Sequence, residues 1–219
     1  MKMNKRPRVL LADDHMIVVE GLRSLLMEDF ELVGVASNGR EMIDQCLALS
    51  PDVVVADISM PLLNGIDAVQ QLRNQGAKAK IVFLTMHADA NYATRAFEAG
   101  ASAYVLKHAA SDELVAAIGA ALNGATYLSN SLRNASLEER LLPGSTHLKE
   151  VIELTPRQRE VVQLIAEGKS AKEIGAILNI SSRTAETHKY RVMDDLGLKT
   201  TAELVQYAIR HGIVNAGLT

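Results

Sequence analysis

Five polar residues have the side chains that phosphoryl transfer to a carboxylate requires, namely Asp13, Asp14, Asp57, Thr85 and Lys107. A carboxylate can attack phosphorus as a nucleophile and give an aspartyl phosphate. A lysine ammonium and a threonine hydroxyl can then hold the phosphoryl oxygens. Three carboxylates in one small cleft repel each other, and Mg²⁺ relieves that repulsion because it binds carboxylates together with waters and phosphate oxygens. The residue types therefore predict a magnesium-dependent phosphoryl-acceptor site, provided that the fold brings them together.

Each of these residues follows a short apolar run, and the runs predict the strands that would bring the five together. The runs are rich in β-branched residues and lie at 9–12, 32–36, 53–56, 81–84 and 103–106. Apolar runs without alternating polar residues are typical of strands buried on both faces of a parallel sheet. Segments with helical spacing lie between them, which predicts a doubly wound α/β sandwich. Ligands bind beyond the carboxyl ends of such strands, where the five residues are expected to converge.

A polar residue at a strand end also has a simpler interpretation, because strand ends emerge into solvent. That interpretation stays open for each of the five residues taken alone. It weakens when all five occur together, because their side chains complement one another in phosphoryl transfer.

The same residues lie in segments that resemble the receiver domain of two-component signalling. These segments are Asp13-Asp14, Asp57-Ile58-Ser59-Met60-Pro61-Leu62-Leu63-Asn64-Gly65, Thr85 and Tyr104-Val105-Leu106-Lys107. The resemblance covers residues 7–125 and implies a five-stranded parallel sheet in the order 2-1-3-4-5. It further implies that Asp57 accepts a phosphoryl group from a partner histidine kinase, that Thr85 contacts this group and that Lys107 pairs with it.

The resemblance also implies a metal site and a switch residue. Mg²⁺ would be held by Asp14, Asp57 and the backbone carbonyl of Ser59, with Asp13 acting through water. Tyr104 would be the aromatic residue that swings inward when the threonine moves. The alternative for Tyr104 is a strand tyrosine with its hydroxyl group in solvent.

Two histidines lie near the predicted site in the sequence. His108 stands where many receivers have a proline after the lysine, which leaves the geometry of the Lys107–His108 peptide bond open. For His87 and His108 alike, a metal-binding or acid–base role is not expected, because no Cys/His spacing resembles a zinc site.

The rear of the chain, 150–215, predicts a second and wholly helical domain, joined by a linker at 126–149 with a short helix around 137–142. Thr155-Pro156-Arg157-Gln158 has the composition of a capping box that starts a helix. This helix should end at Gly168. A second helix from about Ser170 and a third from about Ser182 would be joined by a tight turn, which indicates a helix-turn-helix at 170–191.

The third helix has a positive local charge although the whole chain has a net charge of −3. Residues 182–191 hold three cations and one anion, which favours contact with nucleic-acid phosphates. The alternative is an amphipathic helix with a solvated charged face. The DNA-binding candidates are Arg183, Thr184, Glu186, Thr187, His188, Lys189, Tyr190 and Arg191.

Three stretches resemble the LuxR-type DNA-binding domain over residues 147–213, namely 154–161, 168–174 and 184–188. With the receiver in front, the chain resembles a NarL/FixJ-type response regulator. The resemblance implies that Glu186, Thr187 and Tyr190 face bases, and that Thr184, His188, Lys189 and Arg191 lie at or near the DNA backbone. Ala185 stands where the family usually has valine, and Glu186 stands where a basic or polar residue is common, so the target sequence cannot be deduced.

The resemblance implies that phosphorylation controls dimerisation and DNA binding. The implied partners are a cognate histidine kinase, double-stranded DNA and a second copy of the chain. Candidates for the dimer contact on the last helix are Leu204, Val205, Tyr207, Ala208 and Ile209, which could equally be core residues.

Composition is compatible with this function. Residues 1–130 hold 11 basic and 15 acidic side chains, and residues 148–219 hold 10 and 9, so the front domain is acidic and the rear one nearly neutral. The single cysteine, Cys46, cannot form an intrachain disulfide, and no apolar stretch is long enough for a signal peptide or membrane span. We therefore expect a cytoplasmic protein without a membrane partner.

Three other functions would use some of the same residues. An aspartate-nucleophile phosphatase would carry a second aspartate two residues after the nucleophile, where this chain has Ser59. Enzymatic turnover beyond phosphotransfer and autodephosphorylation is therefore not expected. A phosphorylation-switched protein-interaction module and a constitutive DNA binder both stay open, and salt-dependent DNA binding would distinguish the first of these from a DNA-binding regulator.

Overall fold

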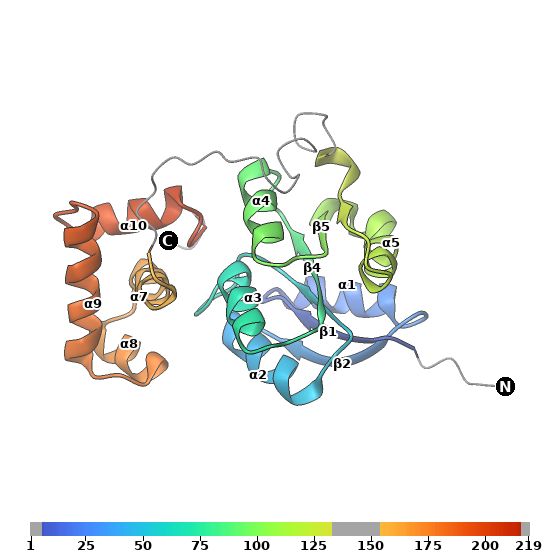
Figure 1. Ribbon diagram of the computed structural model, residues 1–219, viewed down its shortest axis with the longest axis horizontal. Helices are drawn as coiled ribbons and strands as arrows, with labels where there is room; N and C mark the ends of the chain where they lie inside the picture. Colours follow the sequence, from blue (N-terminus) through green and yellow to red (C-terminus); the bar gives the residue numbers. More distant parts are fainter. Residues whose placement is uncertain (1–5, 133–153, 216–219) are drawn as a thin grey trace. The chain divides into compact units, whose positions relative to one another are not determined.

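The computed structural model describes residues 6–132 and 154–215. The chain divides into two compact units, Met1–Ser145 and Thr146–Thr219, which are coloured from blue to yellow and from orange to red (Figure 1). The predicted short helix around 137–142 and most of the predicted linker lie outside the described residues. In the ranges that the structure describes, no helix is both long and apolar enough to cross a membrane.

The first unit is built on a parallel sheet with the order β2-β1-β3-β4-β5-β6. The strands are β1 (Arg8–Ala12), β2 (Glu31–Ala36), β3 (Val53–Ala56), β4 (Lys80–Thr85), β5 (Ala103–Leu106) and β6 (Tyr127–Leu128). The predicted order of the first five strands is confirmed. The count of five is wrong, because β6 pairs in parallel with β5 inside the range predicted as linker. A strand of two residues is too short to give a periodic signal.

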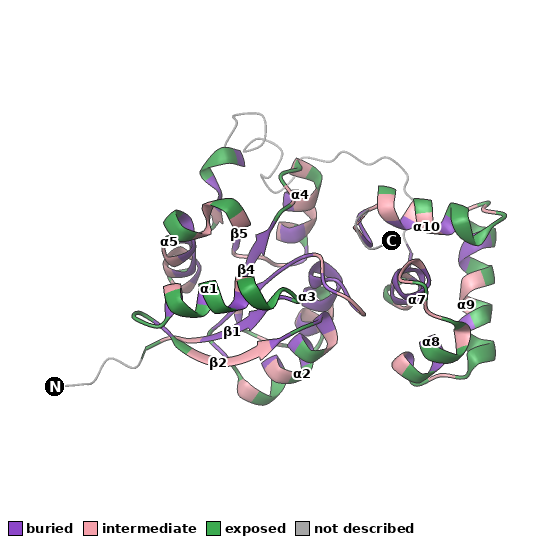
Figure 2. Ribbon diagram, turned by 180° about the vertical axis from the view of Figure 1, so that it is seen from behind, coloured by how far each residue is buried: buried purple, intermediate pink, exposed green. Residues whose placement is uncertain are grey.

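Helices cover both faces of the sheet (Figures 1 and 2). They are α1 (Met16–Leu26), α2 (Gly39–Leu49), α3 (Gly65–Asn74), α4 (Ala90–Glu98) and α5 (Ala110–Leu122). One buried cluster joins the sheet to α2, α3 and α4, and a second cluster joins the opposite face to α1 and α5. All residues of β3 and β5 are buried, as expected for central parallel strands packed on both sides.

The loop after β3 is held against the sheet by a close approach at Gly65, the first residue of α3. A Cβ atom at this position would collide with the backbone carbonyl oxygen of Asp57, so only glycine fits. The Gly65 amide donates a hydrogen bond of 2.8 Å to the Ile58 carbonyl. Asn64 caps the helix by accepting from the Asp67 amide. This turn therefore fixes the backbone that carries the Asp57 side chain.

The second unit contains α7 (Pro156–Ala166), α8 (Ala171–Leu178), α9 (Ser182–Asp195) and α10 (Thr201–Arg210). The predicted capping box of Thr155 and Gln158 is present at the start of α7, and Ser170 and Glu173 form another at the start of α8. Asn179 ends α8 in the left-handed conformation, with φ 53°, which asparagine tolerates better than most residues. The tight turn that follows it leads into α9.

The approach of α8 to the turn requires glycine. A Cβ atom at Gly175 would lie 2.8 Å from the Ile180 carbonyl oxygen, too close for a real side chain. The same pair is joined by a hydrogen bond of 2.9 Å from the Ile180 amide to the Gly175 carbonyl. Together these contacts fix the start of α9 relative to α8.

Candidate phosphoryl-acceptor site and nucleic-acid interface

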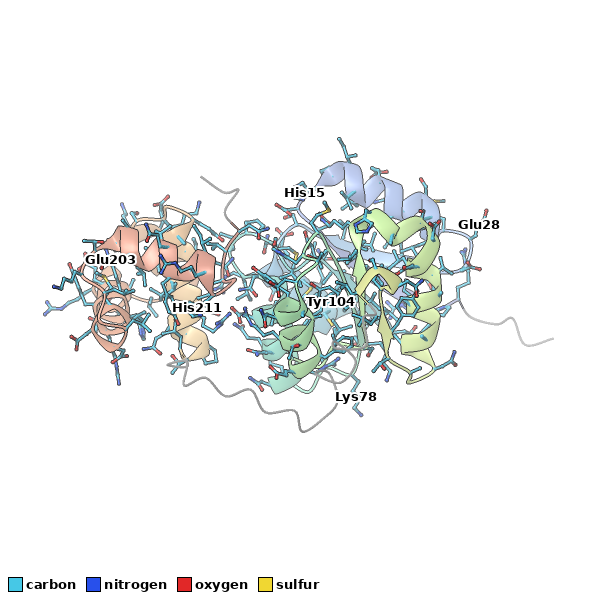
Figure 3. All side chains as sticks on the ribbon, turned by 90° about the horizontal axis from the view of Figure 1, so that it is seen from above. His15, Glu28, Lys78, Tyr104, Glu203 and His211 are labelled. Carbon is cyan, nitrogen blue, oxygen red and sulfur yellow. The ribbon has the colours of Figure 1, made fainter. Side chains whose placement is uncertain are left out.

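Four side chains meet at the carboxyl edge of the sheet. Asp13, Asp14 and His15 follow β1, and Asp57 follows β3. Each offers one ligand atom, and these atoms all lie within 4.8 Å of one another. Asp13 and Asp57 are buried at 3% and 4% exposure, whereas Asp14 and His15 reach the surface. His15 lies beside the start of α1 (Figure 3). The convergence expected for the aspartates is therefore present.

Lys107, from the end of β5, lies between two of the carboxylates. Its Nζ atom is 2.7 Å from Asp13 Oδ2 and 2.8 Å from Asp57 Oδ2. Burial alone would lower the pKa of Lys107, but the carboxylates of Asp57 and Asp13 outweigh it and raise that pKa. The ammonium group therefore stays charged at neutral pH and offsets part of the repulsion between the two aspartates.

The Asp57 carboxylate has both oxygens held by the protein. Oδ1 accepts hydrogen bonds from the amides of Ile58, at 2.6 Å, and Ser59, at 3.3 Å, while Oδ2 accepts from Lys107. Burial raises the pKa of Asp57, and Lys107 opposes this shift without cancelling it. The ionised carboxylate is thus poorly hydrated but firmly oriented, as a nucleophile that waits for an electrophile should be.

The donor set fits Mg²⁺. Asp13, Asp14 and Asp57 supply carboxylate oxygens in one small space, and hard oxygen donors are what this ion prefers. Three carboxylates against the one ammonium group of Lys107 also leave an excess of negative charge, which a dication would neutralise.

Thr85 and Tyr104 are both joined by hydrogen bonds to the backbone of His87, in the loop after β4. Thr85 ends β4, is fully buried and accepts a hydrogen bond of 3.3 Å from the His87 amide. Tyr104 is 0% exposed and is labelled inside the domain in Figure 3. Its hydroxyl group donates to the His87 carbonyl at 2.8 Å. The alternative of a tyrosine with its hydroxyl group in solvent is therefore wrong, and the side chain points inward.

Sequence reasoning placed His87 near the site but missed the contacts that it makes, and it missed His15 of the acidic cluster altogether. The Nε2 atom of His87 lies 2.7 Å from the Ser59 hydroxyl oxygen, and its ring stacks on Tyr92 with centroids 3.9 Å apart. Burial lowers the pKa of His87, so the ring is neutral at pH 7. The position of His87 in the sequence did not indicate these contacts, because they depend on how the loops after β3 and β4 fold and on where α4 begins. His108, by contrast, is exposed, and the Lys107–His108 peptide bond is trans.

We expect His87→Ala to lower the free energy of unfolding of the receiver by about 1–2 kcal/mol, because it removes one hydrogen bond and one ring contact. Urea denaturation measures this. The matched control is His108→Ala, which removes an exposed imidazole from the segment that follows the next strand, β5, and should change stability by less than about 0.5 kcal/mol. If both variants lose the same free energy of unfolding, the contact between His87 and Ser59 does not contribute to stability.

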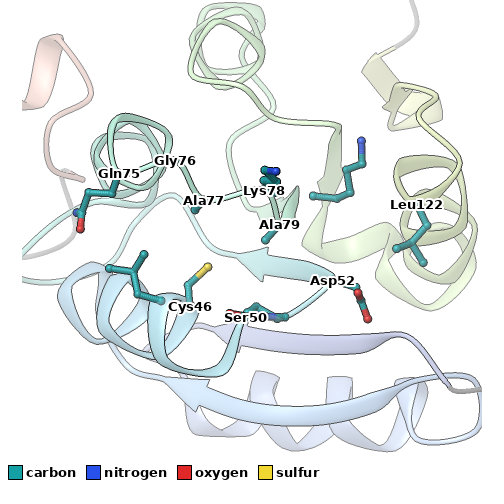
Figure 4. Close-up of a pocket in the computed structure, with 12 residues that line it drawn as sticks. Cys46, Ser50, Asp52, Gln75, Gly76, Ala77, Lys78, Ala79 and Leu122 are labelled. Carbon is teal, nitrogen blue, oxygen red and sulfur yellow. The ribbon is translucent and has the colours of Figure 1, made fainter.

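A separate cavity of about 580 Å³ opens at the opposite edge of the sheet (Figure 4). It lies where α2 and α3 end, and Ser50, Asp52 and Lys78 are among its lining residues. The free thiol of Cys46 also faces it and is buried. The candidate residues for phosphoryl transfer therefore lie at the carboxyl edge and not at this cavity.

The candidate DNA contacts lie on α9 as a mostly exposed face. Arg183, Thr184, Glu186, Thr187, Tyr190 and Arg191 are exposed, and His188 and Lys189 are half-buried. Lys189 Nζ lies 6.0 Å from the centroid of the Tyr190 ring. The Thr187 hydroxyl donates to the Arg183 carbonyl at 2.9 Å, so it already has a partner within the helix.

Ala185 differs from its neighbours on α9, because it is 1% exposed and belongs to the domain core. It lines a cavity of about 330 Å³ beside Lys169, Lys189 and Thr201. Its small size therefore affects packing beneath the helix and not the surface that would face bases. Of the last-helix candidates, Leu204 and Ala208 are core residues, while Val205, Tyr207 and Ile209 are half-buried.

Comparison with known families covers both units. Residues 9–119 match the family Response regulator receiver domain. Residues 153–208 match Bacterial regulatory proteins, luxR family. The chain is a response regulator. It is a phosphorylation-dependent transcriptional regulator and not an enzyme in the usual sense. Its acidic cluster is of the kind with which receiver domains bind Mg²⁺.

Similar proteins match this response regulator along nearly their whole length. The transcriptional regulatory protein MctR of Rhizobium johnstonii is 40% identical, over 97% of this chain and 99% of MctR. The response regulator UvrY of Escherichia coli K12 is 32% identical, over 95% and 96%. A solved structure of two RcsB dimers bound to two parallel DNAs is 27% identical, with a TM-score of 0.56 over 93% of this chain and 98% of that one.

Proposed function

We propose that Asp57 is the phosphoryl acceptor of this response regulator and that its phosphorylation controls dimerisation and DNA binding through α9. The observation that carries this proposal is the position of the Asp57 carboxylate. It is buried at the carboxyl edge of the sheet, held by two backbone amides and contacted by Lys107, which also contacts Asp13. The donor would be a phosphohistidine of a cognate kinase.

The transfer uses groups that are already in place. An oxygen of Asp57 attacks the phosphorus atom, the P–N bond to the donor imidazole breaks, and that imidazole takes up a proton. Lys107 then turns from the carboxylate to an oxygen of the phosphoryl group, and the hydroxyl group of Thr85 contacts another. Mg²⁺, held by Asp14, Asp57 and the Ser59 carbonyl with Asp13 acting through water, would neutralise the charge on the transferred group.

The same site would also limit the lifetime of the phosphorylated form. Water attack on phosphorus releases inorganic phosphate and restores the Asp57 carboxylate. Ser59 stands where an aspartate phosphatase carries its general acid, and a serine hydroxyl is a poor proton donor in that role. We therefore propose slow autodephosphorylation without further turnover.

The DNA-binding half would use the exposed face of α9. Arg183, Lys189 and Arg191 supply positive charge for phosphates, and Glu186 could accept a hydrogen bond from cytosine N4. The RcsB structure holds dimers on DNA, which supports a homodimer on paired half-sites for this chain. A cytoplasmic location is part of this proposal, because the regulator would act on DNA and its single cysteine suits a reducing compartment.

Selection of genomic DNA fragments with and without beryllofluoride and Mg²⁺ tests the proposal. We expect the native protein to retain a defined set of fragments only when beryllofluoride is present. Asp57→Asn should select the same weak set in both conditions. Identical selection by the native protein with and without beryllofluoride would leave DNA binding intact but remove the switch.

A further inference from the structure

Residues 127–132, which comprise β6, Ser129 and the short 3₁₀ helix Asn130–Leu132, are named the output segment. We infer that the output segment carries the position of Tyr104 to the chain that leads into the DNA-binding domain, and that Glu113 is the positioning residue that holds it. This inference rests on the proposed function, because it names how the phosphorylated site reaches the second unit.

Tyr104 is attached to the output segment by its backbone. β5 and β6 pair in register, with Tyr104 opposite Leu128. The amide of Ser129 donates to the Tyr104 carbonyl at 2.8 Å, and the amide of Tyr127 donates to the Ser102 carbonyl at 3.0 Å. The strand bonds therefore bracket Tyr104 itself, and a backbone shift at this residue moves the output segment.

The side chains give a second connection on the same face of the sheet. Leu128 and Leu132, each 8% exposed, belong to the buried cluster that contains Tyr104. The Tyr104 hydroxyl group donates to the His87 carbonyl in the loop after β4, and the His87 amide donates to the hydroxyl oxygen of Thr85 at 3.3 Å. Because protein cores are close-packed, a ring that changes its position displaces its neighbours. Tyr104 thus joins the candidate phosphoryl site to the output segment.

Glu113 fastens the output segment from the other face. It lies in the first turn of α5 and is 7% exposed. Its Oε2 atom accepts a hydrogen bond of 2.6 Å from the Ser129 hydroxyl group, and its Oε1 atom accepts one of 3.2 Å from the Asn130 amide. Ser129 is fully buried. A buried carboxylate with two donors makes strong, directional hydrogen bonds, so the segment is held to α5 while its leucines pack beside Tyr104.

This arrangement has two consequences. With Glu113 in place, the whole output segment is displaced together with Tyr104, because its hydrogen bonds to Glu113 stay intact. With Glu113 replaced, Lys107 keeps its contacts with Asp13 and Asp57, but the shift of Tyr104 on phosphorylation that the receiver resemblance implies is absorbed by a loosened segment. The gain in DNA affinity on phosphorylation would then be smaller.

The test measures amide hydrogen exchange of residues 127–132 in the full chain, with and without beryllofluoride and Mg²⁺. In the native protein we expect beryllofluoride to change exchange at Ser129 by about threefold or more. In Glu113→Gln, exchange at Ser129 and Asn130 should be faster by about tenfold before any addition and should no longer respond. Ser129→Ala should give the same result at Asn130, and it serves if Glu113→Gln does not fold.

A second readout links the segment to output. Phosphoryl incorporation from acetyl phosphate into Glu113→Gln should stay within about twofold of the native rate, while the gain in DNA affinity on phosphorylation should fall about fivefold or more. Asp112→Asn, an exposed neighbour on α5, should behave as native protein. The inference is overturned if beryllofluoride does not change amide hydrogen exchange at residues 127–132 of the native protein. It is also overturned if Glu113→Gln keeps the full gain in DNA affinity on phosphorylation. If beryllofluoride changes amide exchange in the native protein but does not change its DNA affinity, the proposed function is contradicted instead.

Discussion

Asp57→Asn is expected to abolish phosphoryl incorporation, because the amide that replaces the carboxylate is a poor nucleophile at phosphorus. The fold should survive the change. Burial raises the pKa of Asp57, so the native state holds a proton on this group more readily than the unfolded chain does. Stability therefore falls as the pH rises through the raised pKa, and at neutral pH the ionised side chain is a destabilising group. We expect the free energy of unfolding of the variant to be no lower than that of the native protein.

The measurement is incorporation of phosphate from acetyl phosphate with Mg²⁺, followed by mass spectrometry of the intact chain. Asp29→Asn is the matched control, because Asp29 is an exposed aspartate between α1 and β2 and lies outside the acidic cluster. This control should incorporate phosphate at the native rate. Stable incorporation into Asp57→Asn at the native rate would place the acceptor at another residue. Loss of incorporation together with lost stability would point to misfolding.

Replacing Arg183, Lys189 and Arg191 together with alanine is expected to remove most of the DNA affinity at physiological salt. Each cation that contacts a phosphate contributes about 0.9 to the slope of log affinity against log salt, so the triple variant should lose about 2 to 3 from that slope. Arg183 and Arg191 are exposed and Lys189 is half-buried, so truncation should leave the core intact. Fluorescence anisotropy across a range of salt concentrations measures both quantities.

Two further variants make this result specific. Lys78→Ala removes an exposed cation from the receiver and should leave the slope unchanged. Glu186→Ala should alter which sequence is preferred, because base contacts specify and phosphate contacts position, while leaving the slope unchanged or slightly steeper. An unchanged slope in the triple variant would show that α9 does not face the DNA backbone.

The sequence predicted the receiver well because its functional residues follow strands. Val53 to Ala56 form an uninterrupted buried run, so the position of Asp57 just beyond it could be deduced from hydrophobic pattern alone. Lys107 and Thr85 follow β5 and end β4 in the same way. The parallel sheet then brings together residues that are far apart in the chain, and the topology needs no side-chain detail to do so.

The features that escaped prediction depend on tertiary contacts. His87 contacts Ser59 only because the loops after β3 and β4 lie against each other, and it stacks on Tyr92 at the start of α4. Tyr127 and Leu128 form a strand only because β5 offers an open edge. On α9 the charge pattern indicated the exposed face, but the burial of Ala185 is set by packing against its own domain. The local hydrophobic pattern of a sequence indicates which residues are buried. It gives little information about which loops contact each other in the folded domain.

Lys107 forms ion pairs with both Asp13 and Asp57, and this has a consequence for how a metal ion would enter and leave the cleft. A dication that enters this cleft must share two carboxylates with an ammonium group that is already there, so part of the electrostatic attraction is cancelled in advance. Such a cleft should hold its ion weakly and release it quickly, unlike a cage of unpaired carboxylates. Occupancy would then follow the free ion concentration of the surroundings, and each cycle of phosphorylation could start from either the filled or the empty cleft without a slow loading step.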